Sequence, residues 1–298
     1  MNLNFIRLRA NIMLFITAFI WGATFVAQKS AMDFLGPYTF NGLRCLIGSF
    51  SLFILGLFIT HGKRNKKPLK SRKNLIEGGI MAGVLLFLAT TLQQAGIVYS
   101  TAGKAGFITS LYIVLVPVFS LISGKKITRY VWIGVIFALI GLYLLCVKDS
   151  FMIGRGDLII LFSAVFFALH IMCISKYAKK TDSIKLSCLQ FLFAGIFATV
   201  LGLFFEQTRM IDIYNCTKEL FYAGVLSCAV AYTLQIKAQK NVRPYIASLI
   251  LSLESVFAVL AGFLILHETL TIKEAIGCVL MFAAVFVAQF HAKNGNKT

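Results

Sequence analysis

The sequence predicts an all-α polytopic membrane protein, with ten transmembrane helices arranged as two inverted five-helix repeats. Three observations lead to this fold class. The 298 residues are 59% hydrophobic and only 13% charged, whereas soluble domains average about 25% charged residues. Long apolar segments alternate with short polar linkers. Two distant stretches of the chain also resemble each other, which indicates an internal repeat.

The apolar segments set the number of spanning helices. A helix needs roughly 20 residues to cross the hydrocarbon core of a bilayer. The first apolar run follows Arg7 and Arg9 and lacks a small-residue cleavage site, so we expect it to be retained as a span. The ten predicted spans are 10–30, 37–60, 75–99, 102–123, 130–147, 156–176, 184–205, 218–237, 242–265 and 271–291.

Basic residues gather in every second linker. With the N-terminus inside, the inner segments hold 21 Lys and Arg residues and the outer linkers hold seven. Because cytoplasmic loops are enriched in Lys and Arg, this asymmetry predicts a multi-pass cell-membrane protein with both termini in the cytoplasm. The basic loop 61–73 is expected to be a cytoplasmic topology determinant, and binding of anionic lipid headgroups is its alternative role. The formal charge of +18 is thus assigned to topology, with no nucleic acid as partner.

The two halves of the sequence can be aligned. The stretch Thr17–Ala31 aligns with Ser163–Ala178 at an offset of 146 residues, which places Arg44 opposite Gln190. The predicted repeats cover residues 11–147 and 156–290. Each contains five spans, an odd number, so the second repeat is expected to be inverted relative to the first. Inverted repeats are typical of secondary transporters, whose substrate site lies near the midplane between the repeats.

Motifs of other functional classes are missing from the sequence. It contains no hydrolytic triad, Walker motif or glycine-rich phosphate loop. The seven cysteines show no CxxC spacing and no histidine-rich surroundings, so we expect no metal site, no disulfide framework and no cofactor. Cysteines inside the apolar segments are interpreted as small packing residues.

Three blocks carry a resemblance to a known family. They are WGATFVAQKSA in the first span, TLQQAGIVYSTAGKAGFITSLYIVLVPVF across the third and fourth, and IASLILSLESVFAVLAGFLILHETLTIKEAIG across the ninth and tenth. The chain resembles the drug/metabolite transporter superfamily, EamA type, over nearly its whole length. That family often has a Glu-Pro pair in the ninth helix. Here Ser255 follows Glu254, so the resemblance does not predict a hinge at this position.

Two charged residues inside the spans are the main candidates for chemistry. Glu254 lies about 12 residues into the ninth span, near the middle of the membrane. A titratable acid at this depth suits proton coupling, and a hydrogen-bonded contact between helices is the alternative. Arg44 lies in the outer half of the second span, where it can bind a substrate carboxylate or phosphate, pair with an acid, or extend outward. Glu254 is a possible partner of Arg44.

Further polar residues are expected to line a substrate cavity between the repeats. Small residues and lone polar groups can also serve helix packing, which is the alternative for each candidate. Trp21, Thr24 and Gln28 share one face of the first helix through their i, i+3, i+7 spacing. The other cavity candidates are Gln94, Lys104, Tyr112, His170, Gln190, Tyr232 and Ser252.

Gln94 and Lys104 are expected at the outer rim of that cavity. Neighbouring residues on a helix diverge by about 100°, so Gln93 and Gln94 cannot both point into one cavity. Gln94 is the candidate for the cavity, which of the two faces it is left open, and the other would hydrogen-bond a neighbouring helix. Lys104 begins the fourth span, where its cationic head can reach the outer interface or turn inward toward an anionic solute.

These observations predict a secondary active transporter that exports small organic metabolites, such as amino acids or amphipathic drugs, by alternating access and with proton coupling through Glu254. Its partners would be a small-molecule solute and the lipid bilayer, and the chain would act as a monomer or a homodimer. A facilitative exchanger of an anionic metabolite is the first alternative. A membrane-embedded enzyme that modifies lipids is the second, although the four histidines are scattered over different spans and linkers.

Overall fold

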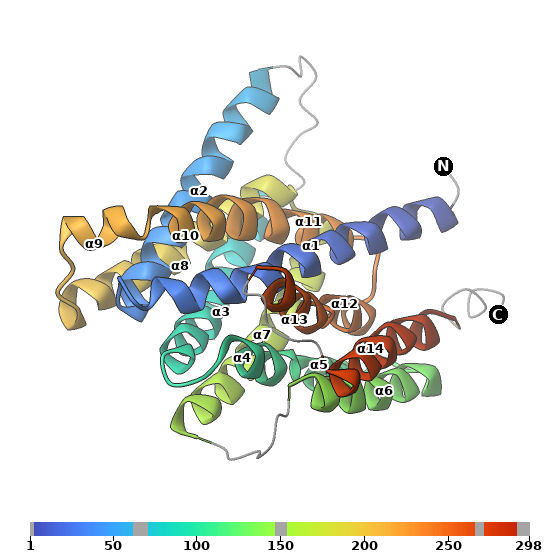
Figure 1. The fold of residues 1–298 in the computed structure, drawn as a ribbon. Coiled ribbons are helices and arrows are strands. Elements are labelled where there is room, and N and C mark those ends of the chain that lie inside the picture. Colours follow the sequence, from blue (N-terminus) through green and yellow to red (C-terminus); the bar gives the residue numbers. More distant parts are fainter. Residues whose placement is uncertain (1–2, 62–70, 147–153, 266–270, 291–298) are drawn as a thin grey trace.

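The protein is a bundle of helices. The computed structural model describes residues 3–61, 71–146, 154–265 and 271–290, and within these ranges it contains helices and turns but no strand. Figure 1 shows the helices packed into one body, with the start of α1 and the end of α14 toward the same side of the view. The all-helical fold predicted from composition is confirmed.

The first half of the chain contains the helices α1 (Leu3–Ala31), α2 (Pro37–His61), α3 (Arg72–Ile97), α4 (Ala102–Ser110), α5 (Tyr112–Ile122) and α6 (Arg129–Cys146). The second half contains α7 (Arg155–Tyr177), the 3₁₀ turn η1 (Ala178–Lys180), α8 (Ser183–Phe205), α9 (Met210–Asn215), α10 (Thr217–Phe221), the π-helical segment η2 (Tyr222–Ala231), α11 (Tyr232–Gln239), α12 (Pro244–Leu251), α13 (Glu254–Ile265) and α14 (Ile272–Phe290).

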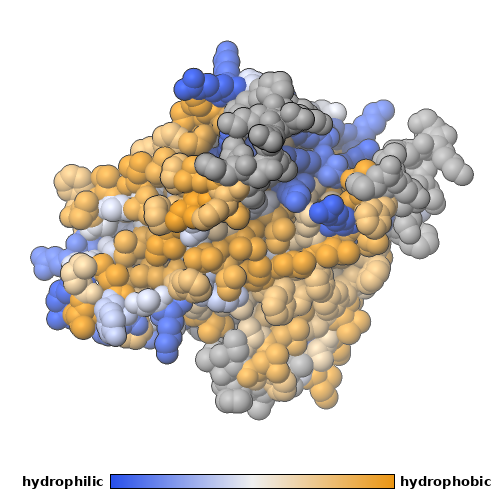
Figure 2. Space-filling model, turned by 90° about the horizontal axis from the view of Figure 1, so that it is seen from above, coloured by the Kyte–Doolittle hydropathy of each residue, from blue (hydrophilic) through white to orange (hydrophobic). Residues whose placement is uncertain are grey.

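Each predicted span coincides with a helix or a run of consecutive helices. Within the described ranges, nine of them are long and apolar enough to cross a membrane, and the segment Arg129–Leu145 of α6 is a shorter apolar helix. The prediction of a polytopic membrane protein is therefore confirmed. Its surface agrees, because Leu203, Phe204 and Phe58 are 75–80% exposed, which suits contact with lipid. Figure 2 shows a largely hydrophobic face with hydrophilic clusters toward two opposite ends.

Three of the predicted spans are not single regular helices. The span 102–123 is interrupted at Leu111, between α4 and α5, and the span 242–265 is interrupted at Ser252 and Leu253, between α12 and α13. The span 218–237 contains a π-helical stretch, and the N–H of Tyr232 donates to the carbonyl of Ser227, five residues earlier. The resemblance did not predict a hinge in the ninth span, because Ser255 stands where the family often has proline, yet the helix is interrupted directly before Glu254.

Serine side chains explain the interruption between α12 and α13. The hydroxyl of Ser248 donates to the carbonyl of Tyr245 at 3.0 Å, and that of Ser252 donates to the carbonyl of Leu249 at 2.9 Å. Such bonds compete with the backbone ladder of a helix. The turn tightens to i→i−3 spacing, since the N–H of Leu253 bonds to the carbonyl of Ile250 at 3.2 Å. No proline is required for this break.

Glycines allow the helices to approach closely. A Cβ atom added at Gly277 of α14 would lie 2.7 Å from the carbonyl oxygen of Gly141 on α6. A Cβ atom added at Gly156 of α7 would lie 2.6 Å from the carbonyl oxygen of Gly96 on α3. Small residues at such contacts are the usual means of packing helices in a membrane, where no hydrophobic effect drives helices together.

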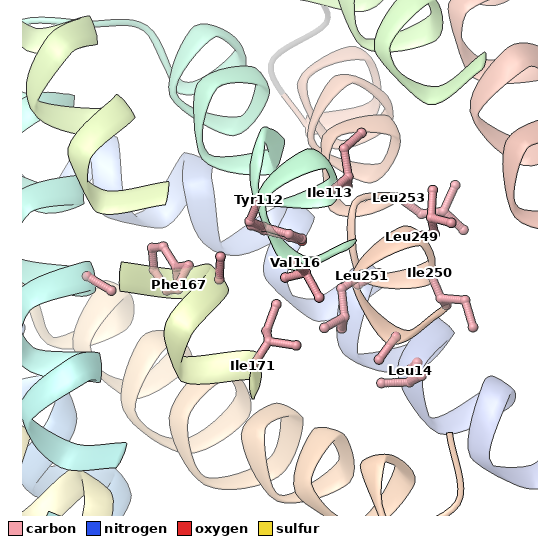
Figure 3. Packing of buried hydrophobic residues seen from close by; sticks show 14 of the residues in the cluster. Leu14, Tyr112, Ile113, Val116, Phe167, Ile171, Leu249, Ile250, Leu251 and Leu253 are labelled. Atoms are coloured by element: carbon pink, nitrogen blue, oxygen red, sulfur yellow. The ribbon is translucent and has the colours of Figure 1, made fainter. Parts of the chain in front are cut away.

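The centre of the bundle is filled by residues from several helices. Figure 3 shows Tyr112 and Val116 of α5 beside Phe167 and Ile171 of α7, with Leu251 of α12 nearby. Val116 and Leu251 are completely buried. The two interrupted helices, α4–α5 and α12–α13, thus pass through the middle of the molecule, where their breaks lie next to a polar cavity.

Candidate functional site

A small cavity lies at the centre of the bundle. Its volume is about 40 Å³, which is room for a few water molecules. Its walls come from α1, α2, α3, α4, α5, α7, α8, η2, α11 and α13, so both halves of the chain contribute. Seven of the candidates from the sequence line it, namely Trp21, Thr24, Gln28, Arg44, Tyr112, Tyr232 and Glu254.

Glu254 stands where the two interrupted helices meet. It is the first residue of α13, at the end of a helix where backbone N–H groups favour a negative charge. Its Oε1 accepts hydrogen bonds from the hydroxyls of Tyr112 at 2.9 Å and Ser110 at 3.4 Å. The hydroxyl of Ser255 lies 2.8 Å from that of Ser110 and donates to the carbonyl of Gly106 at 3.1 Å. Hydroxyl groups therefore join the break of α12–α13 to the break of α4–α5.

Arg44 lies in the first half of the chain, whereas Glu254 lies in the second. The side-chain amide of Asn41 holds it in place. Nε of Arg44 donates to Oδ1 of Asn41 at 3.0 Å, and Nδ2 of Asn41 in turn donates to the hydroxyls of Thr90 and Thr91 at 3.0 and 2.9 Å. The guanidinium carbon lies 5.5 Å from the centre of the Phe40 ring. No carboxylate in the described ranges forms an ion pair with Arg44. The pairing of Arg44 with Glu254 is thus not seen, although both residues line the same cavity.

The aromatic part of the lining is built around Tyr232. The ring centre of Trp21 lies 4.5 Å from that of Tyr232, and the ring of Phe191 meets Tyr232 edge-on at 5.1 Å. Two buried polar atoms of the lining, Nε1 of Trp21 and Oε1 of Gln28, have no hydrogen-bond partner among the described residues. Buried polar atoms without partners are costly, and here they lie where a solute or water could bind them. Thr24, by contrast, donates to the carbonyl of Ile20 at 2.7 Å.

The side chains of Gln93 and Gln94 point in different directions, as expected. Gln93, and not the candidate Gln94, faces the cavity. Gln93 lines the cavity, and its Nε2 donates to the hydroxyl of Thr109 at 3.0 Å. Gln94 is fully buried outside the lining, and its Nε2 donates to the carbonyl of Gln28 at 3.1 Å. The sequence shows that only one can face the cavity, and the packing of α3 against α1 decides which.

Four further candidates lie away from the cavity lining. Nε2 of His170 lies 3.0 Å from Oε1 of Gln190, so these two residues pair with each other between α7 and α8. The hydroxyl of Ser252 donates within its own helix. Nζ of Lys104 lies 2.5 Å from Oδ2 of Asp157, and Oδ1 of the same carboxylate accepts from the hydroxyl of Ser100 at 2.9 Å. Lys104 therefore connects the start of α4 to the start of α7.

Several lining residues were not expected from the sequence. They are Phe25, Cys45, Thr90, Gln93, Thr109, Phe167, Phe191, Ser227 and Cys228. Phenylalanine, threonine and cysteine are common throughout the apolar spans, so their type gives no signal. Cys45 and Cys228 were interpreted as packing residues and do lie in the buried core, and they also form part of the cavity wall where α2 packs against η2.

Comparison with known proteins identifies the family. Residues 8–147 and 154–289 each match the EamA-like transporter family, and together these ranges cover most of the chain. The chain belongs to the EamA-like transporter family. The predicted resemblance is confirmed, and the protein is a multi-pass membrane transporter of the drug/metabolite type, which acts on a small-molecule solute in a lipid environment.

Two relatives of this EamA-like transporter match it over more than nine-tenths of its length. A protein from Archaeoglobus fulgidus, named an uncharacterized transporter, is 34% identical over 286 residues, covering 94% of this chain and 86% of the relative. YoaV from Bacillus subtilis, also named an uncharacterized transporter, is 26% identical over 278 residues, covering 91% and 93%. A crystal structure with 16% sequence identity superposes with a TM-score of 0.79 over 96% of this chain and 98% of the other, which shows the same fold.

Proposed function

We propose that this EamA-like transporter is a secondary active exporter of small organic metabolites, such as amino acids or amphipathic drugs. The observation that carries this proposal is the composition of the central cavity. A cation (Arg44) and an acid (Glu254) line it together with the aromatic rings of Trp21, Tyr112 and Tyr232. A solute with a carboxylate, an amine and an apolar body would find a matching group for each part.

The proposed mechanism is alternating access between two inverted repeats, residues 11–147 and 156–290. The contacts between helices support this division. α1 packs against α13, and its counterpart α7 packs against α4 and α5. In the same way, α3 packs against α8. Their counterparts in the other repeat, η2 and α2, also pack against each other. The cavity then lies between the repeats, as expected for transporters built in this way.

The size of the cavity supports the same mechanism. Sites for small organic ligands usually enclose about 300–1,000 Å³, whereas this cavity has about 40 Å³. An amino acid or a drug cannot fit without movement of the surrounding helices. We therefore assign the structure to a closed conformation, from which the repeats separate toward one side or the other to admit the solute.

We further propose that both termini and the loop 61–73 are cytoplasmic and that the protein resides in the cell membrane. The asymmetry of Lys and Arg supports this orientation. Residues 62–70 of this loop lie outside the described residues. Protease treatment of intact cells and of inverted vesicles would test it, because cleavage of this basic loop is expected only in the inverted vesicles.

Proton coupling is assigned to Glu254. The supporting geometry is its position on the cavity with hydroxyl donors from the opposite repeat, Ser110 and Tyr112. Protonation would remove the negative charge that these donors stabilise. It would therefore weaken the hydrogen bonds that join the break between α4 and α5 to the break between α12 and α13. Movement of the repeats and occupancy of Glu254 by a proton are thereby linked.

Transport by purified protein in liposomes tests the function. Labelled neutral amino acids and amphipathic amines would be supplied singly, with and without an imposed pH gradient. We expect saturable flux for at least one class, and accumulation against its gradient only when the pH gradient is present. Flux that is saturable but never exceeds equilibrium would contradict coupling, and no flux for any class would contradict the proposed substrates.

A facilitative exchanger of an anionic metabolite is the second candidate. The observation that favours it is the absence of a carboxylate paired with Arg44 among the described residues, which leaves its positive charge available to an anion. Liposomes loaded with unlabelled sugar phosphate or dicarboxylate would then take up the labelled anion by exchange. Exchange without any response to a pH gradient would favour this candidate over the first.

A further inference from the structure

The side chain of Asn41 is a fully buried amide next to the wall of the central cavity. It belongs to α2, is completely inaccessible to solvent, and is not one of the residues that line the cavity. Arg44, about one helical turn further along α2, does line the cavity. Asn41 can therefore influence a bound solute only through the residues that it contacts.

Every hydrogen-bonding group of this amide has a partner. Its Oδ1 accepts from Nε of Arg44 at 3.0 Å and from Sγ of Cys45 at 4.0 Å. Its Nδ2 donates to the hydroxyls of Thr90 at 3.0 Å and Thr91 at 2.9 Å on α3. A side-chain amide has two N–H donors and two lone pairs on its oxygen, so its full capacity is used. Because these partners are buried, rotation of the amide would leave polar groups unpaired, and its position is therefore fixed.

The hydroxyl of Thr90 also decides which way the amide points. It donates its proton to the carbonyl of Leu86 at 2.7 Å, so only its oxygen is left to interact with Asn41. A reversed amide would place its NH₂ group against Nε of Arg44, where two donors would meet. The exchange of oxygen and nitrogen that is often open for an asparagine is thus excluded here, and the oxygen faces Arg44.

The amide restrains the guanidinium of Arg44 without neutralising its charge. The bond to Asn41 uses only Nε, and the ring of Phe40 lies 5.5 Å from Cζ as a second contact. Among the described residues, Nη1 and Nη2 form no hydrogen bond and no carboxylate forms an ion pair with Arg44. These two groups form a fork that can donate to both oxygens of one carboxylate, and a guanidinium held in one plane suits this geometry.

We propose that Asn41 is a positioning residue, which holds the guanidinium of Arg44 at the cavity wall and leaves its Nη groups and its positive charge for the carboxylate of a solute. The role rests on the proposed function, in which Arg44 binds the solute, and it narrows the solutes to carboxylates such as amino acids. Glu254 on the same cavity disfavours a doubly charged phosphate, because like charges at close range cost binding energy.

Nitrogen NMR of the purified full-length protein tests the positioning without any need for transport. The protein would carry isotope-labelled arginine, and Arg44→Lys would identify the Nε signal of Arg44 by its loss. Formate is the probe, because this bare carboxylate is small enough for a cavity of about 40 Å³. In the wild type we expect slow exchange of the Nε proton with water and a saturable shift of the signal with formate at constant ionic strength.

Asn41→Asp is the decisive variant, because it keeps the shape of the amide and adds a negative charge. Affinity for formate is expected to fall more than about tenfold, since the new carboxylate pairs with Arg44 and repels the anion. Thr91→Val removes one hydroxyl that accepts from the amide, so it should speed exchange of the Nε proton and weaken formate binding less. Gln239→Glu is the matched control and should bind formate as the wild type does, because Gln239 is a 1% exposed amide of α11 outside the cavity lining.

Three results would overturn the positioning role. They are a rapidly exchanging Nε proton in the wild type, no saturable response of the wild type to formate, and equal formate affinity in the wild type and Asn41→Asp. If Asn41→Asp does not fold, Thr91→Val decides, and unchanged exchange and affinity in that variant would overturn the role.

Flux in liposomes connects the positioning role to the proposed function. Leucine would be compared with isopentylamine, which lacks its carboxylate, and with isocaproate, which lacks its amine. Asn41→Asp is expected to raise KM for leucine and isocaproate more than about tenfold, with kcat little changed, and to leave KM for isopentylamine nearly unchanged. An equal loss for all three solutes would indicate a purely structural residue and reject the role. If the formate results hold but the wild type transports none of the three, the proposed function fails and the positioning by Asn41 stands.

Discussion

The hydroxyl of Tyr112 donates a 2.9 Å hydrogen bond to Oε1 of Glu254, although 142 positions separate these residues in the chain. Tyr112 is the first residue of α5 and Glu254 is the first residue of α13, so each begins a half-helix after a break. Both side chains are nearly inaccessible to solvent. One bond therefore joins the two points at which the central helices can bend, and it contains the acid that we assign to coupling.

Replacement of that acid should separate coupling from translocation. Glu254→Gln keeps the size and a hydrogen-bond acceptor but cannot bind or release a proton at neutral pH. We expect loss of accumulation driven by a pH gradient, while exchange of solute across liposomes continues. Glu77→Gln is the control, because Glu77 is an exposed carboxylate on α3. Accumulation by Glu254→Gln at the wild-type level would reject the assignment.

Tyr112→Phe should weaken the junction between the breaks. The change removes only the hydroxyl that donates to Glu254, and a buried polar group left without its hydrogen-bond partner costs about 1–3 kcal/mol. A lower midpoint of thermal unfolding in detergent is expected, with faster backbone exchange in α5 and α13. Tyr99→Phe serves for comparison, since Tyr99 is 74% exposed. Equal effects of the two substitutions would argue against a special role for the junction.

Arg44 should select solutes that carry a carboxylate or phosphate. Arg44→Gln is expected to raise KM for anionic or zwitterionic solutes by about tenfold or more and to leave that for amphipathic amines nearly unchanged. Arg44→Lys should restore only part of the affinity, because lysine cannot form the two parallel hydrogen bonds of a guanidinium. Arg129→Gln controls for the loss of a positive charge, because Arg129 is an exposed residue at the start of α6. A uniform loss for all solutes would indicate a structural role.

Glu206 directly follows α8, and its side chain should stabilise the start of the neighbouring helix α2. Its carboxylate accepts from the backbone N–H groups of Tyr38 at 2.9 Å and Thr39 at 2.8 Å. These N–H groups have no partner within their own helix. Glu206→Ala should lower the free energy of unfolding by about 1–2 kcal/mol, measured by denaturation in mixed micelles. Asp33→Asn, at an exposed acid before α2, should change it little.

The glycine contact between α6 and α14 should be intolerant of any side chain. A Cβ atom at Gly141 would lie 2.9 Å from the carbonyl oxygen of Gly277, so Gly141→Ala must push the two helices apart. We expect a destabilisation of about 1–3 kcal/mol. Gly56→Ala provides the opposite case, because nothing lies within 4 Å of the added atom, and alanine in a helix is favoured over glycine. Stabilisation by both substitutions would contradict the contact.

The positions of the spans could be predicted because they depend on hydropathy alone. Most predicted ends lie within a few residues of the observed ones, as in 37–60 against Pro37–His61. The breaks could not be predicted in the same way. At Ser252 the outcome depends on whether a hydroxyl bonds to its own backbone or to another helix, and the sequence leaves both open. The serine at position 255, in place of the family's proline, therefore left the break unpredicted.

The candidate site could be predicted only where the residue type alone decides the position of a side chain. Charge singles out Arg44 and Glu254, because charged residues are costly in lipid and face the interior. Trp21 was identified by its helical spacing with Thr24 and Gln28. The choice between Gln93 and Gln94 depends on how α3 is rotated against α1, which no local pattern encodes. Cys45 and Cys228 gave no signal at all, since a cysteine in an apolar helix has the same appearance whether it packs against leucine or lines a cavity.

The small volume of the central cavity also has a consequence for affinity. A solute that cannot enter the closed form binds only the open molecules, so its apparent affinity is reduced in proportion to their fraction of the population. Substitutions that destabilise the closed form, such as Tyr112→Phe, should therefore tighten binding without adding any contact to the solute. In this protein, weak binding can reflect a well-packed resting state as much as a poor fit.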